Sequence, residues 1–190
     1  MALEAKFREL ILELGKVQDT LVALRLTVVE DKPAKGDAAL VDRLGDVILD
    51  MMGFLDEALN SARTAQKRTG HTLDLNAARR ALTTCQERVH RIGQLFAVEL
   101  VSYEILKDLA SLGHQRRGEW VPWTNSVKQG IEQCREPLDL AAKALAACWQ
   151  EIAERVGTTS VSVTNVNVGQ EFVAKGSEFI GTPGAVSPDC

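Results

Sequence analysis

The sequence is poor in the side chains that enzymes and metal sites use most. Its 190 residues include only three histidines, one tyrosine and four cysteines. Cys85, Cys134, Cys148 and Cys190 show neither a C-x-x-C pair nor the spacing of a zinc knuckle. The chain also lacks a glycine-rich phosphate loop and a nucleophile elbow. We therefore expect no enzymatic activity, no cofactor and no metal.

Charge of one sign and long apolar runs are also missing. The 22 basic and 26 acidic residues are well mixed and give a net charge of −4. This distribution argues against nucleic acid as a partner, because such binding needs a basic stripe. No apolar run approaches the roughly 18 residues of a membrane-spanning helix, and the N-terminus does not resemble a signal peptide. The expected location is the cytoplasm.

The strongest candidate for a metal ligand set is the pair Glu87 and His90. A Glu-x-x-His pair on a helix is half of a di-iron carboxylate site in helical bundles. The second half is missing, because His71 and His114 fall in predicted turns. We interpret His90 as a residue flanking the apolar face of its helix.

Apolar residues recur at alternating steps of three and four through most of the chain, which predicts amphipathic helices. We expect helices over about 2–30, from an Asp37 cap to 69, over 74–113, and over 120–156. Pro137 should kink or split the last of them. Short connections predict antiparallel neighbours, so residues 1–157 should form an all-α, up-down-up-down four-helix bundle. Cys85 and Cys134 fall on apolar faces and should be reduced core thiols.

Residues 158–190 differ from the bundle in composition. The segment 157–170 reads GTTSVSVTNVNVGQ and contains no charge. Valine alternates there with serine, threonine and asparagine, which favours a β-strand. A short, uncharged, proline-free window of this kind is also the signature of a cross-β segment. A linker without fixed structure, or one strand laid against the bundle, remains an alternative from composition alone.

The tetrad Val166-Asn167-Val168-Gly169 resembles the core of RHIM amyloid motifs, which read Ile/Val-Gln-Ile/Val-Gly. Bacterial amyloid signalling motifs are similar, and they follow a helical Bell domain related to HeLo and MLKL-type four-helix bundles. The layout of this chain resembles that arrangement. Asn167 replaces the usual glutamine, and Gln170-Glu171 stand where an asparagine is usual.

The resemblance implies a cell-death effector. A sensor protein with a matching motif would template the tail into amyloid, and the bundle would then move to the membrane and permeabilise its lipids. The implied partners are the sensor, further copies of this chain and membrane lipids. The assembly residues would be Val161, Val163, Asn165, Val166, Asn167, Val168 and Gly169.

The first helix is the expected membrane-active segment, because its apolar residues exceed what one heptad stripe requires. The candidates are Leu10, Ile11, Leu12, Leu21, Val22 and Leu24. A helix buried on two sides is the alternative explanation. Trp120 and Trp123 follow Arg116-Arg117, a pattern that suits either a membrane interface or the end of a bundle.

The rival function is a scaffold or adaptor whose tail adds a β-strand to a partner's sheet. Both functions depend on assembly rather than on catalysis. They differ in whether the tail assembles by itself.

Overall fold

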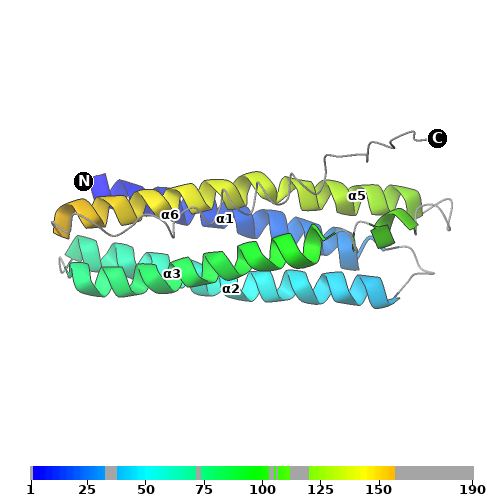
Figure 1. Cartoon of the computed structure of the whole chain (residues 1–190), viewed down its shortest axis with the longest axis horizontal. Coiled ribbons are helices and arrows are strands. Elements are labelled where there is room, and N and C mark those ends of the chain that lie inside the picture. Colours follow the sequence, from blue (N-terminus) through cyan, green and yellow to red (C-terminus); the bar gives the residue numbers. More distant parts are fainter. Residues whose placement is uncertain are drawn as a thin grey trace, which may run out of the picture.

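The computed structural model describes residues 2–32, 38–71, 74–102, 105, 107–111 and 120–156, and this part of the chain is all-α (Figure 1). Helix α1 spans Ala2–Val29, α2 spans Ala38–His71 and α3 spans Leu75–Leu95. A π-helical turn, η1, follows at Phe96–Leu100. Helices α5 (Trp120–Gln133) and α6 (Arg135–Val156) complete the order. The predicted all-α class is confirmed for these residues, and the predicted tail, 158–190, lies outside them.

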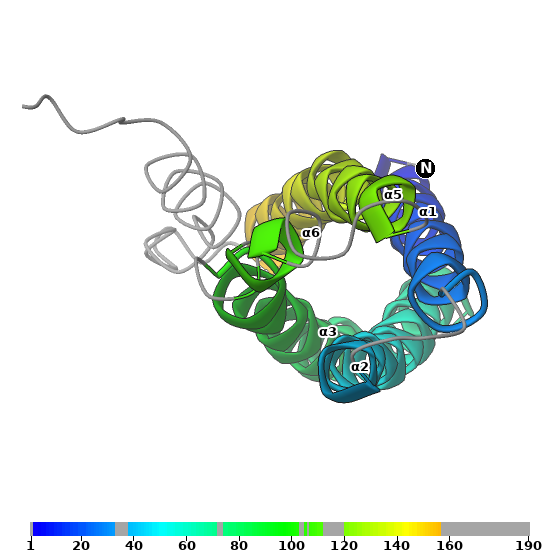
Figure 2. The same cartoon turned by 90° about the vertical axis from the view of Figure 1, so that its right-hand side faces the viewer.

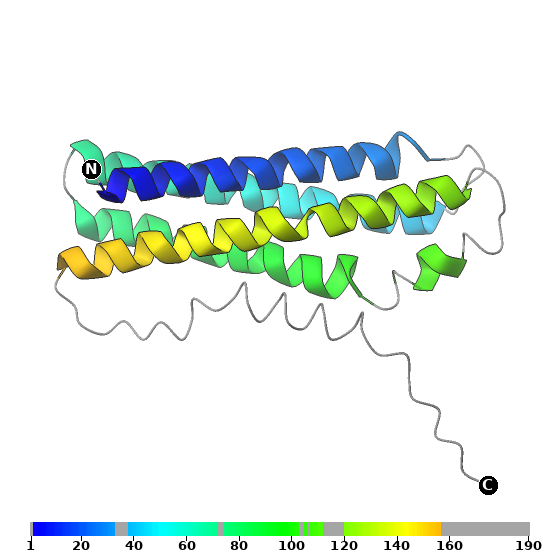
Figure 3. The same cartoon turned by 90° about the horizontal axis from the view of Figure 1, so that it is seen from above.

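The helices lie side by side around one core, as the end-on view in Figure 2 shows. Helix α2 packs against both α1 and α3, and α1 packs on its other side against α5 and α6. Helices α1 and α2 are antiparallel, because Gln18 Nε2 donates to Asp56 Oδ1 over 3.0 Å while Val29 lies near Gly45. Figure 3 shows α5 and α6 following each other along the bundle.

Helix α1 supplies the longest apolar stripe of the core. The eight residues of its predicted heptad stripe are each at most 2% exposed: Leu3, Phe7, Leu10, Leu14, Val17, Leu21, Leu24 and Val28. Steps of three and four keep these positions on one helical face. The sequence pattern therefore identified the buried face of this helix correctly.

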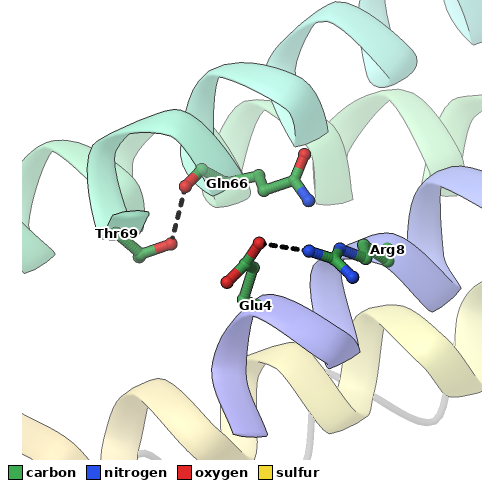
Figure 4. Close-up of polar contacts among 4 residues, drawn as sticks. All are labelled: Glu4, Arg8, Gln66 and Thr69. Carbon is green, nitrogen blue, oxygen red and sulfur yellow. Dashed lines mark hydrogen bonds and ion pairs between the residues drawn. The ribbon is translucent and has the colours of Figure 1, made fainter. Parts of the chain in front are cut away.

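The helix ends are held by local polar contacts. Near the start of α1, Arg8 pairs with Glu4 one turn earlier, and near the end of α2 the Thr69 hydroxyl donates to the Gln66 carbonyl (Figure 4). Asp74 caps α3, because its Oδ1 accepts from the Ala77 amide at 2.9 Å. An aspartate at this position satisfies an amide that has no partner within the helix.

The helix expected over 74–113 is not continuous, which corrects the prediction. Helix α3 ends at Leu95, and the Val101 amide donates to the Phe96 carbonyl five residues earlier, at 3.0 Å. A bond of that span defines a π turn, which accommodates one extra residue. Ser102 Oγ then accepts a hydrogen bond from the Ile105 amide at 3.3 Å. A serine at the N-cap of a helix makes a bond of this kind.

The π turn shifts the apolar register by one residue. Buried positions along α3 follow the heptad steps to Phe96, but the next ones are Leu100, Val101, Ile105 and Leu109. The core positions expected at Tyr103 and Leu106 lie outside the described residues. A π turn places more residues in one turn than an α-helix does, so regular heptad steps do not continue through it.

The helix expected over 120–156 is split, as Pro137 predicted. The break falls at Cys134. Pro137 has no amide hydrogen to donate to the Gln133 carbonyl, and its ring crowds that carbonyl. The Cys134 amide donates instead to the Ile131 carbonyl at 3.1 Å. Its thiol donates to the Gly130 carbonyl at 3.3 Å, which supplies that oxygen with a partner.

Leu10 and Leu12 provide a matched test of this packing, because they lie on the same helix and differ in burial. Leu10 is fully buried and Leu12 is 59% exposed. We expect Leu10→Ala to lower the free energy of unfolding by about 3 kcal/mol, through lost burial and a residual cavity. Leu12→Ala should change it by less than about 0.5 kcal/mol. Urea unfolding followed by circular dichroism measures both, and equal effects would contradict the assigned face of α1.

Candidate functional site

The predicted assembly motif lies outside the described residues. This applies to each of its members: Val161, Val163, Asn165, Val166, Asn167, Val168 and Gly169. Their role in assembly stays a prediction. The candidate sites whose geometry the structure describes lie on the helices.

The six membrane candidates on α1 separate by burial. Leu10, Leu21 and Leu24 are at most 2% exposed and belong to the core, and Ile11 is half-buried against it. Only Leu12 and Val22 are exposed, at 59% and 39%. The buried three can therefore contact lipid only after the helices separate.

The two tryptophans at the start of α5 are core residues. Trp120 and Trp123 are about 5% and 4% exposed, and their rings meet edge to face with centroids 5.1 Å apart. Trp123 Nε1 donates to the Thr27 carbonyl over 2.9 Å, near the end of α1. Buried tryptophan usually satisfies its N–H in this way. In the described arrangement the pair joins α5 to α1, while Arg116-Arg117 lies outside the described residues.

A groove of about 210 Å³ runs between α1 and α5. It is lined by uncharged residues spaced three or four apart on each helix: Thr20, Ala23, Leu24 and Thr27, with Ser126, Gln129, Gly130 and Gln133. Gly130 brings the two helices close, because a Cβ there would lie 2.8 Å from Leu24 Cδ1. The lining offers hydroxyl and amide hydrogen bonds, but none of its side chains is a general acid or base.

The Glu87 and His90 pair shows no metal-binding geometry. His90 Nε2 lies 2.8 Å from Gln94 Nε2, one turn along the same helix, and Glu87 is exposed. No group of three or more potential ligands gathers anywhere among the described residues. The flanking position predicted for His90 agrees with its partial burial.

Three thiols lie in the core. Cys85, Cys134 and Cys148 are reduced and almost fully buried, as the apolar faces predicted for the first two. Burial raises the pKa of each thiol to about 12. The pKa of Cys148 is raised further by the nearby Cys85 and Glu9, and Lys6 opposes them. A buried thiol with a raised pKa forms little thiolate, so we expect these thiols to be unreactive in the folded chain.

Two exposed leucines were not among the predicted site residues. They are Leu26 on α1, which is 43% exposed, and Leu49 on α2, which is 46% exposed. Leu26 could have been noticed, since it lies four residues beyond Val22 on the same side of α1. Leu49 lies at the same height along the bundle as Leu26. This depends on the register between α1 and α2, which the apolar pattern of neither helix encodes.

Comparison with protein families, with curated proteins and with solved structures finds no match for this chain. Across the described residues, no helix combines the length and apolar character that crossing a membrane requires.

The raised thiol pKa values lead to a test in the Cys190→Ser variant, which leaves only the core cysteines. At pH 8 the thiolate fraction at pKa 12 is on the order of 10⁻⁴. We expect no reaction with a thiol-specific disulfide reagent in the folded protein, and reaction of all three thiols in denaturant. The folded state keeps these protons from the ordinary pKa of 9.0 up to about 12, so stability should fall as pH rises through that window. Rapid labelling of any core thiol in the native state would contradict its assigned burial.

Proposed function

We propose that this protein is a regulated cell-death effector that acts by assembly. In the proposed mechanism a sensor templates the 158–190 tail into amyloid, and further copies of the chain add to it. The helical domain then leaves the cytoplasm for the membrane and permeabilises it. The observation that carries the proposal is the uncharged segment with alternating valines, 157–170, which directly follows a helical domain.

The proposal includes a four-helix, up-down-up-down topology for residues 1–157. In this reading α5 and α6 are one helix interrupted at Cys134, and α3 continues through η1 toward the helical residues 107–111. The antiparallel α1–α2 register supports it. So does the common core that these elements share.

The burial of α1 supports a mechanism with a closed and an open state. Its eight-residue stripe is buried, so most of its apolar surface is hidden while the helices remain packed. Exposing that stripe would create a helix face able to lie in a membrane interface. Amyloid assembly of the tail would supply the free energy for this change, because a ligand shifts such an equilibrium through its preference for one state.

We expect the purified full-length chain to form fibres that bind thioflavin, and Val168→Pro to abolish them. Proline removes the backbone N–H that each layer uses to pair with the next, and the defect repeats in every layer. Ser187→Pro is the matched control, because it lies beside Pro188 in a glycine- and proline-rich stretch. Fluorescence and electron microscopy measure the outcome. Fibres of Val168→Pro equal to those of wild type would exclude this motif as the assembly site.

The same variants distinguish the effector from the adaptor in a bacterial host. We expect expression of the full chain with its sensor to cause membrane leakage, and both Val168→Pro and removal of residues 158–190 to prevent it. Uptake of a membrane-impermeant dye measures leakage. A tail that stays monomeric alone and becomes ordered only with a partner would instead favour strand addition by an adaptor.

A further inference from the structure

The register between α1 and α2 determines which of their residues lie at the same level. Gln18 donates to Asp56, and a Cβ on Gly45 would lie 3.5 Å from Val29 Cγ2. In both pairs the residue numbers add to 74, as expected for antiparallel helices that rise equally per residue. Other pairs with about this sum therefore face each other across the α1–α2 interface.

This register places three exposed aliphatic side chains together. Val22 and Leu26 lie four and eight residues beyond Gln18, on the outward flank of the α1 side that meets α2. Leu49 lies two helical turns before Asp56 on α2, at the level of Leu26. Their exposed fractions are 39%, 43% and 46%. Such a cluster between two packed helices leaves apolar surface without a partner among the described residues.

Aspartates surround this cluster. All of them are exposed, and none forms an ion pair within the described part of the chain: Asp19 on α1, and Asp42, Asp46 and Asp56 on α2. Neither Arg25, which is half-buried, nor Arg43, which pairs with Glu99, forms an ion pair with them among the described residues. We call Val22, Leu26, Leu49 and these four aspartates the α1–α2 outer face.

The negative charge of the α1–α2 outer face argues against three possible binding partners. The tail of this chain, 158–190, carries three acidic residues against one lysine, so it has the same sign as the face. A second copy would oppose aspartates to aspartates in a symmetric contact. An anionic lipid surface would be repelled for the same reason. The complementary partner is cationic and has an apolar side.

We propose that the α1–α2 outer face binds a basic amphipathic helix of another protein. Leucine-like side chains of that helix would cover Val22, Leu26 and Leu49, and its lysines or arginines would pair with the aspartates at the rim. The stretch from Asp42 to Asp56 is about 21 Å long, which matches roughly four turns of a bound helix. This recognition goes beyond the proposed effector function and depends on neither the tail nor membrane entry.

The probe is a fluorescein-labelled 18-residue peptide of leucine and lysine, with leucines at steps of three and four. A peptide with glutamate at every lysine position is its charge control. We expect the full-length protein to bind only the lysine peptide, and to bind it more weakly as salt is raised. Fluorescence anisotropy gives the affinity, and amide chemical shifts of the complex should change at residues 19–26 and 42–56.

Paired substitutions test the location. Leu26→Gln with Leu49→Gln should weaken binding at least tenfold, and Asp42→Asn with Asp46→Asn by about fivefold with a smaller salt dependence. Val121→Gln is the apolar control, since Val121 is 39% exposed on α5, away from the α1–α2 interface. Glu87→Gln with Glu154→Gln removes the same charge elsewhere. Neither control should change the affinity.

Several results would overturn the proposal. They are equal binding of the glutamate peptide, affinities unchanged by the face variants, or shift changes confined to other helices. Binding of phosphatidylglycerol vesicles that the face variants abolish would assign the face to a membrane. A sedimentation dimer that the same variants dissociate would assign it to self-association. Fibre formation and dye leakage are separate measurements, so failure here leaves the effector function standing and the reverse also holds.

Discussion

The burial of one stripe along α1 is the constraint on which the described structure depends. Helix α1 contacts α2 on one side and α5 and α6 on the other, and α3 reaches this core mainly through α2. Leu24 shows how close the packing is, because Gly130 of α5 leaves no room for a Cβ beside it. Trp123 adds a hydrogen bond to the Thr27 carbonyl near the end of the same helix. Removing α1 would therefore leave α2, α5 and α6 without the partner that they share.

Sequence reasoning succeeded where one helix carries its own information. The stripe from Leu3 to Val28 and the interruption before Pro137 are local patterns, and the structure has both. It failed at Phe96–Leu100, because a heptad count assumes a constant number of residues per turn. Ser102 was a usable signal, since serine in an apolar stretch favours a helix start over a helix interior.

The candidate sites were less predictable than the fold. The heptad pattern assigned Leu10 to the buried face and left Leu12 outside it, as the structure has them, yet the predicted membrane-active set included both. The cluster of Leu26 and Leu49 follows only from the register that Gln18 and Asp56 establish. The tail motif differs from this cluster, because its prediction rests entirely on the order of residues in the sequence. The two proposed functional regions therefore differ in kind, because one is a surface that folding creates and the other is a segment that its residue order distinguishes.

The π turn at η1 limits how many residues can be added to or removed from the chain around Phe96–Leu100. Each residue added to or removed from a helix rotates everything beyond it by about 100°. Leu100 and Val101 are both buried where the turn at Phe96–Leu100 takes up one residue of phase. Losing one residue before Phe96 would turn those side chains away from the core, whereas losing one within η1 would straighten the helix. Single-residue insertions and deletions in α3 and η1 should therefore be tolerated best within η1. Related chains that differ in length in this region should differ there.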